Sequence, residues 1–155
     1  MFDTFRPRWP LVALIVSGAL LAGAHAFETF GRMAPCPMCL SQREWHWGIV
    51  AIALVALFAR RDAREAAFIL GLAYLGSFAM AGWHVGVEQH WIAATCEAAA
   101  GGSLVFDLNA ALDVPHCDTP AWTMLGVSMA GYNALISLAM MMGSVIVAFM
   151  PERKT

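Results

Sequence analysis

Charged residues are scarce in this 155-residue chain: they make up 13% of it, against about 25% in ordinary soluble domains. Hydrophobic residues reach 60%, so the few charges do not suffice to cover the surface that a folded chain of this length exposes to water. This scarcity excludes a soluble globular enzyme and a disordered tail. The net charge of −2 excludes a basic nucleic-acid binder, so no nucleic-acid partner is expected. The composition indicates an integral membrane protein.

Charges are absent, or confined to one end, in four stretches that are each about long enough to cross the hydrocarbon core as a helix. These stretches are residues 10–27, 40–59, 66–87 and 122–150. The sequence thus predicts an all-α membrane protein, a single integral domain over residues 1–155 built as a bundle of four transmembrane helices. Two loops, 28–39 and 88–121, then lie on the same side of the membrane.

The first stretch also has features of a signal peptide. It follows two arginines and ends in Ala24-His25-Ala26, which imitates a cleavage site. Its apolar core is longer than that of a typical signal peptide, and only a retained helix gives an even number of spans. We therefore expect the helix to be retained, and cleavage would not change the side on which Cys36 lies.

Basic residues are distributed unevenly between the two sides. Seven of the nine fall at the N-terminus, in the turn near residues 60–65 and at the C-terminus, which would share one side of the membrane. Because cytoplasmic segments carry the excess of Lys and Arg, both termini are predicted to be cytoplasmic. The two loops then lie on the outer side of the membrane, and the protein is predicted to cross the membrane several times.

All four cysteines fall in the two predicted outer loops, Cys36 and Cys39 in the first and Cys96 and Cys117 in the second. In a bacterial-type topology the outer compartment is oxidising, so disulfides persist there. Cys96 and Cys117 fit a stapling disulfide and an exchange-competent pair equally well. A relay that takes electrons from the cytoplasm is disfavoured, since no cysteine falls on the predicted inner side.

The segment Cys36-Pro37-Met38-Cys39 is a C-x-x-C motif, a spacing typical of redox exchange or metal binding. A disulfide here would close a very small loop and remove little unfolded-state entropy, so a structural staple is a weak explanation. Haem attachment would need His at position 40, where the chain has Leu. A zinc site made of all four cysteines is the alternative, although the second pair is not spaced as C-x-x-C. We predict redox-active cysteines and no metal.

The residues after the motif support a thiolate or an anionic ligand. The predicted helix start at Leu40 places Cys39 at a helix N-terminus, where free N–H groups stabilise a thiolate. Arg43 lies one turn further on the same face, where a cation would stabilise a thiolate or a ligand oxygen. A snorkelling interface arginine is the alternative. His46 continues this face, either as a ligand-binding residue or as a structural one.

Electrons released at the membrane edge need an acceptor. The sequence carries no nucleotide or flavin fingerprint, so a lipid-soluble quinone, either ubiquinone or menaquinone, is the economical choice. It reaches a site between helix ends directly. The competing class is a non-catalytic membrane scaffold whose cysteines form structural disulfides or bind zinc.

These residues resemble the bacterial disulfide-bond formation protein B family, inner-membrane proteins that reoxidise a periplasmic DsbA-like oxidase of the thioredoxin fold. The resemblance rests on Cys36-x-x-Cys39-x-x-x-Arg43 at the opening of the second of four helices, followed by a loop with a second cysteine pair. The segment 117–122 is also similar to the family's approach to its last helix. The vitamin K epoxide reductase family is less similar, because its C-x-x-C follows the other pair.

The resemblance implies a protein-dithiol:quinone oxidoreductase that works with the DsbA-like partner, membrane lipid and the quinone pool. It also implies a multi-pass protein of the bacterial inner membrane whose cysteines lie on the periplasmic side. The partner's thiolate would attack Cys96, and Cys117 would leave and pass the electrons to Cys36. Cys39 would then be the thiolate that faces the quinone, with Arg43 assisting the ring oxygen.

Two further positions follow from the same resemblance. A histidine before the second cysteine pair is linked to the quinone site in some members of this family, and His90 and His84 are the two candidates for that place here. Glutamate often precedes the arginine in the family, whereas this chain has Gln42. A contribution of that acid is therefore not expected here.

Overall fold

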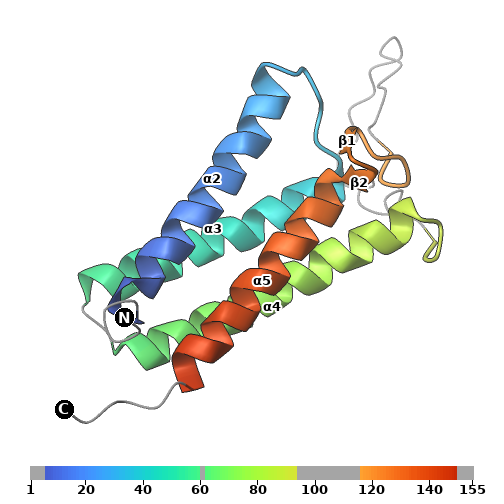
Figure 1. Cartoon of the computed structure of the whole chain (residues 1–155). Coiled ribbons are helices and arrows are strands. Elements are labelled where there is room, and N and C mark those ends of the chain that lie inside the picture. The colour runs from blue at the N-terminus through green and yellow to red at the C-terminus, as the bar shows by residue number, and fades with distance from the viewer. Residues whose placement is uncertain (1–5, 60–61, 94–115, 150–155) are drawn as a thin grey trace, which may run out of the picture.

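The computed structural model describes residues 6–59, 62–93 and 116–149, and these residues fold almost entirely into helices (Figure 1). A short 3-10 turn, η1 (Arg6–Arg8), leads into α2 (Trp9–Thr29), which is followed by α3 (Pro37–Phe58), α4 (Ala63–Glu88) and α5 (Met129–Phe149). Two short strands, β1 (Thr123–Met124) and β2 (Val127–Ser128), precede α5. The described part of the protein is therefore mostly helical.

The starts of α3, α4 and α5 each carry a proline or a capping side chain. Pro37 is the first residue of α3, a position that suits proline because its missing N–H would have no partner there. Asp62 caps α4 by accepting a hydrogen bond from the backbone N–H of Arg64 at 2.7 Å. At the start of α5, Oγ of Ser128 accepts a hydrogen bond from the N–H of Gly131 at 3.1 Å.

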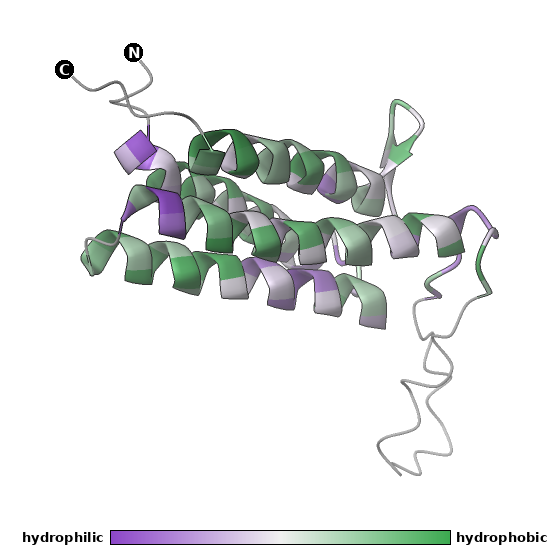
Figure 2. Ribbon diagram, turned by 90° about the horizontal axis from the view of Figure 1, so that it is seen from below, coloured by the Kyte–Doolittle hydropathy of each residue, from purple (hydrophilic) through white to green (hydrophobic). Residues whose placement is uncertain are grey.

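Within the described residues, three helical segments are long and apolar enough to cross a membrane: Arg6–Thr29, α4 and α5. α3 has a similar length, but Gln42, Arg43, Glu44 and His46 make its first half more polar. Many large apolar side chains point outward from the bundle, and Figure 2 shows that the helices are hydrophobic along most of their length. The chain is a multi-pass membrane protein.

The helices pack unevenly. α4 packs along its length against α5, and α3 packs against both α2 and α4. The main core lies toward the end where α2 begins and consists of Trp9, Ala13, Ile49, Ala53, Ala67, Leu70, Tyr74, Met140 and Val147. α2 and α5 contact each other much less, and they diverge toward the end where α2 stops (Figure 1). The cysteines lie at this divergent end.

The last helix begins at Met129, seven residues later than the apolar run 122–150 predicts. β1 and β2 pair instead as an antiparallel hairpin. The two residues between the strands, Leu125 and Gly126, have φ angles of 51° and 79°, and a type I′ turn requires positive φ at both positions. This turn reverses the chain before α5, so the apolar character of residues 122–128 does not produce a helix.

Candidate active site

Cys36 and Cys39 lie at the N-terminus of α3, and both are free thiols. Cys36 is the N-cap residue: its Sγ accepts a hydrogen bond from the N–H of Cys39 at 3.3 Å, and the two Sγ atoms lie 3.0 Å apart. The helix starts at Pro37 and not at Leu40 as the sequence predicts. The free N–H groups of the first turn therefore favour a thiolate at Cys36 and not at Cys39.

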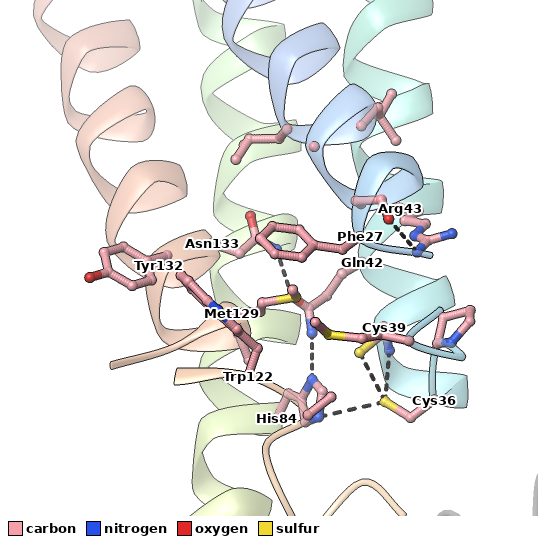
Figure 3. Close-up of a pocket in the computed structure, with 18 of the residues that line it drawn as sticks. Phe27, Cys36, Cys39, Gln42, Arg43, His84, Trp122, Met129, Tyr132 and Asn133 are labelled. Carbon is pink, nitrogen blue, oxygen red and sulfur yellow. Dashed lines mark hydrogen bonds between the residues drawn. The ribbon is translucent and has the colours of Figure 1, made fainter. Parts of the chain in front are cut away.

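His84 of α4 completes the surroundings of Cys36. Its side chain is buried, and its Nε2 lies 3.8 Å from Sγ of Cys36 (Figure 3). Hydrogen bonding from Cys39, and to a smaller extent from His84, lowers the pKa of Cys36 to about 4, although burial acts in the opposite direction. In the reduced pair the negative charge therefore resides on Cys36.

A cavity of about 340 Å³ lies beside the two cysteines and is lined from α2 on one side and from α5 on the other. Apolar side chains form much of its wall, among them Leu20, Leu21, Phe27, Met129 and Ile136. Polar groups from Arg43, His46 and Asn133 interrupt this wall at a few points. An apolar cavity with a few fixed polar groups is typical of a small-molecule site.

Arg43 lies one turn beyond Cys39 and lines the cavity. Its side chain is 15% exposed; it forms an ion pair with Glu28 and donates a hydrogen bond to the carbonyl oxygen of Ala24 at 3.1 Å. Both partners belong to the last turns of α2. The guanidinium is thus held between α2 and α3. A snorkelling arginine would instead extend its side chain to the membrane surface. Glu28 is not among the predicted site residues, because nothing in the sequence pairs it with Arg43.

His46 and His84 lie inside the bundle, whereas His90 does not. His46 is buried and lines the cavity, and its Nε2 lies 2.7 Å from Oδ1 of Asn133. His90 is exposed just beyond the end of α4, with a φ of 57°, and does not line the cavity. Its position does not support the prediction of His90 as a ligand-binding residue. Because α4 ends at Glu88, His84 lies within this helix and inside the bundle, whereas His90 follows the end of the helix.

Cys117 is buried and disulfide-bonded. It packs with Cys36, Met38 and Val87 in one small cluster. Cys96, the other member of the second predicted pair, lies outside the described residues. The structure thus places one member of the second pair against the C-x-x-C.

Two further buried residues belong to the site and are absent from the sequence prediction as functional residues. Gln42 lies with its Nε2 2.6 Å from Nδ1 of His84, and Asn133 donates a hydrogen bond to Oε1 of Gln42 at 2.7 Å. Every buried side-chain N or O atom of the described residues has a hydrogen-bond partner. The available signal was the presence of polar residues in otherwise apolar helices, which are costly in lipid unless they are paired.

The fold and the site define a multi-pass helical membrane protein with a C-x-x-C pair at the wall of an apolar cavity. The family model of disulfide bond formation protein DsbB matches residues 6–147, and the chain belongs to this family. The resemblance inferred from the cysteine and arginine pattern is thereby confirmed. Membership implies a membrane protein of disulfide-bond formation.

Curated relatives agree with this assignment. Disulfide bond formation protein B of Methylococcus capsulatus is 30% identical over 144 residues, covering 84% of this chain and 86% of that protein. Disulfide bond formation protein B of Herminiimonas arsenicoxydans is 38% identical over 86 residues, covering 55% of this chain and 54% of that protein. An uncharacterised protein of Rickettsia prowazekii is 24% identical over 154 residues, covering 92% of this chain and 87% of that protein. No solved structure matches the chain significantly.

Proposed function

We propose that the protein oxidises the dithiol of a periplasmic DsbA-like oxidase of the thioredoxin fold and passes the electrons to a membrane quinone. The position of the C-x-x-C carries this proposal. Cys36 packs against Cys117 on one side, while Cys36 and Cys39 line the apolar cavity on the other. A cysteine pair in that position is able to exchange with a second pair and still face a lipid-soluble acceptor.

Thiol–disulfide exchange would move the electron pair in balanced steps. The partner's thiolate attacks Cys96 of a Cys96–Cys117 disulfide, and Cys117 leaves as a thiolate. Cys117 attacks Cys36 of the oxidised C-x-x-C, whereupon the Cys36–Cys39 bond breaks and Cys39 leaves as a thiolate.

Two further exchanges complete the transfer. The partner's second thiolate releases Cys96 and closes the partner's disulfide. Cys96 then attacks Cys117, which restores the second pair and releases Cys36 as a thiolate. The electron pair then resides on Cys36 and Cys39.

The residues of the cavity fit a quinone head group. When bound, a quinone would supply the acceptor for the two electrons of the reduced Cys36–Cys39 pair, and because Cys36 is a thiolate, at least one of the two protons for the quinol would come from water. The apolar wall between α2 and α5 suits the ring and its lipid tail. Arg43 offers a cationic donor to a ring oxygen, and His46 lines the same cavity. Their fixed contacts to Glu28 and Asn133 hold both side chains in place before a ligand arrives.

We further propose that α3 is a fourth membrane span, that both termini are cytoplasmic and that the cysteines face the periplasm of a bacterial inner membrane. α3 has nearly the length of its neighbours and packs between α2 and α4. Arg6, Arg8 and Arg64 precede or open helices at the end of the bundle opposite to Cys36. This distribution supports a cytoplasmic assignment for that end.

A non-catalytic scaffold with structural disulfides or a zinc site is the alternative. One observation favours it: the Sγ atoms of Cys36 and Cys39 and a ring nitrogen of His84 lie within 4.8 Å of one another, as zinc ligands do. A zinc scaffold, however, does not explain the apolar cavity beside the three residues, and quinone reduction does.

The test is anaerobic mixing of detergent-purified protein with a reduced thioredoxin-fold dithiol oxidase and a short-chain quinone. Quinone absorbance is followed over time. We expect one quinone to be consumed for each partner disulfide formed, and no turnover by Cys39→Ser. A Cys39→Ser protein as active as the wild type would refute the thiol mechanism. Absence of turnover together with stoichiometric zinc would establish the scaffold.

Arg43→Ala tests the cavity separately from the cysteines. Because a hydrogen bond from a charged donor is lost, the KM for quinone should rise about tenfold or more, while the KM for the protein partner stays unchanged. Arg64→Ala, which removes an exposed arginine at the far end of α4, is the matched control. A quinone KM for Arg43→Ala equal to that of the control would contradict the assignment of Arg43.

A further inference from the structure

Three buried side chains from three helices connect the interior of the bundle to Cys36. Asn133 of α5 donates from Nδ2 to Oε1 of Gln42 at 2.7 Å, and Nε2 of Gln42 lies 2.6 Å from Nδ1 of His84. Nε2 of His84 in turn faces Sγ of Cys36 at 3.8 Å. Figure 3 shows these contacts as one continuous line from Asn133 to Cys36.

The order of donors and acceptors along this line follows from the chemistry of the amide groups. A carboxamide has an oxygen that only accepts and an NH₂ group that only donates. Because Asn133 donates to the oxygen of Gln42, Gln42 presents its NH₂ group to His84, and Nδ1 of His84 must accept. A neutral imidazole with a bare Nδ1 carries its proton on Nε2, the atom that faces Cys36.

Asn133 is held in this orientation from its other side. Its Oδ1 accepts a hydrogen bond from Oγ of Ser137 at 3.2 Å and lies 2.7 Å from Nε2 of His46. Ser137 and His46 are both buried. With the oxygen engaged by these two residues, the NH₂ group of Asn133 is the part left to contact Gln42.

We propose that Gln42 and Asn133 are positioning residues that hold His84 in the tautomer whose Nε2–H donates to Cys36. This inference rests on the proposed function, in which Cys36 leaves as a thiolate when Cys96 restores the second pair. An Nε2–H stabilises that thiolate, whereas the lone pair of the other tautomer would repel it. A better stabilised thiolate also leaves faster in an exchange.

Other titratable groups near Cys36 do not replace this donor. Cys39 is a donor to Cys36 from its own helix turn, and it acts in addition to His84. The carboxylate of Glu88, one turn from His84 on α4, lies 3.9 Å from Nε2 and only accepts. Arg43 is paired with a carboxylate of α2.

The test is nitrogen NMR of reduced protein with isotope-labelled histidine, at neutral pH in detergent. It reports which ring nitrogen is protonated and needs neither quinone nor partner. His84→Asn identifies the His84 signals. We expect a bare Nδ1 and a protonated Nε2 in the wild type. In Gln42→Glu we expect a protonated Nδ1, because a carboxylate accepts and does not donate.

A second measurement does not depend on the folding of Gln42→Glu. Asn133→Leu frees the Gln42 amide to turn, so the midpoint of the thiolate absorbance of Cys36 should rise by about one pH unit, a tenfold change in its acid constant. Ser144→Ala is the matched control, because it removes a buried hydrogen bond from Trp9 to α5 in the opposite half of the bundle. It should change neither the midpoint nor the His84 signals.

The outcomes separate this inference from the proposed function. A proton on Nδ1 in the wild type, an unchanged His84 pattern in Gln42→Glu, or an unshifted midpoint in Asn133→Leu would overturn the positioning role. A wild-type protein that shows the expected tautomer but reduces no quinone would refute the proposed function alone.

Discussion

In the reduced protein, Cys36 should ionise at a much lower pH than an ordinary thiol. Its sulfur lies 3.0 Å from the Sγ of Cys39, faces Nε2 of His84 at 3.8 Å and accepts a hydrogen bond from the N–H of Cys39 at 3.3 Å. These contacts lower the pKa of Cys36 from 9.0 to about 4. Because the pKa is lowered, the thiolate is present above about pH 4 and is lost as the pH falls through that value.

The alkylation rate at neutral pH is a poor measure of this shift. A thiol with the ordinary pKa of 9.0 is about 1% ionised there, so the shift raises the thiolate fraction about 100-fold. Nucleophilicity falls with pKa with a coefficient of about 0.4–0.5, and over about five units this lowers the reactivity of each thiolate about 100- to 300-fold. The two effects nearly cancel. The pH of half-maximal alkylation therefore reports the pKa, and a single rate does not.

The assay is alkylation of reduced protein by iodoacetamide over a range of pH, with modified Cys36 quantified by peptide mass spectrometry. We expect a midpoint near pH 4 for the wild type. Cys39→Ala removes the S–H but keeps the backbone N–H and His84, so its midpoint should lie between that value and 9.0. His90→Ala is the control and should leave the midpoint unchanged. A wild-type midpoint near 9.0, or no shift in Cys39→Ala, would refute the reasoning.

Two other substitutions test the packing and the hairpin, and both are measured by thermal unfolding in detergent. Gly143→Ala directs a methyl group into the ring of Trp9 and should destabilise the protein by about 1–3 kcal/mol, whereas the methyl group of Gly18→Ala meets no neighbour. Equal stabilities of the two variants would contradict the close approach of α5 to Trp9. Leu125→Asn should raise the unfolding midpoint slightly, because Leu125 has a φ of 51° that asparagine adopts more easily. A lower midpoint would argue against the left-handed turn.

Apolar runs in the sequence predict some of the helices well and others poorly. Residues 66–87 carry no charge, and α4 extends this run only to its cap at Asp62 and to Glu88. Residues 122–128 also carry no charge and yet form a hairpin, because the positive φ angles of Leu125 and Gly126 reverse the chain. Hydrophobicity reports a preference for lipid, and it does not distinguish a helix from a turn that lies at its end.

The same limit applies to the site. Cys36, Cys39 and Arg43 are predictable because their spacing along a single helix fixes how they lie to one another. Gln42 and Asn133 are 91 residues apart, and their contact depends on the rotation and depth of two separate helices. Local sequence does not specify either quantity. Which cysteine of the C-x-x-C carries the thiolate depends on where α3 begins: a start at Pro37 favours Cys36, and a start three residues later would favour Cys39. The apolar run does not define this boundary.

The buried contacts that run from Asn133 through Gln42 and His84 to Cys36 link the stability of the bundle to its chemistry. Helices in lipid gain little from burying apolar surface against one another, because the lipid is equally apolar, so close packing and interhelical hydrogen bonds specify their arrangement. Asn133 and Gln42 join α5, α3 and α4 and at the same time orient His84 toward Cys36. A substitution that weakens these contacts should therefore change both the stability of the protein and the pH at which half of Cys36 is ionised. A substitution at Gly143, which lies against Trp9 of the main core, should change the stability alone.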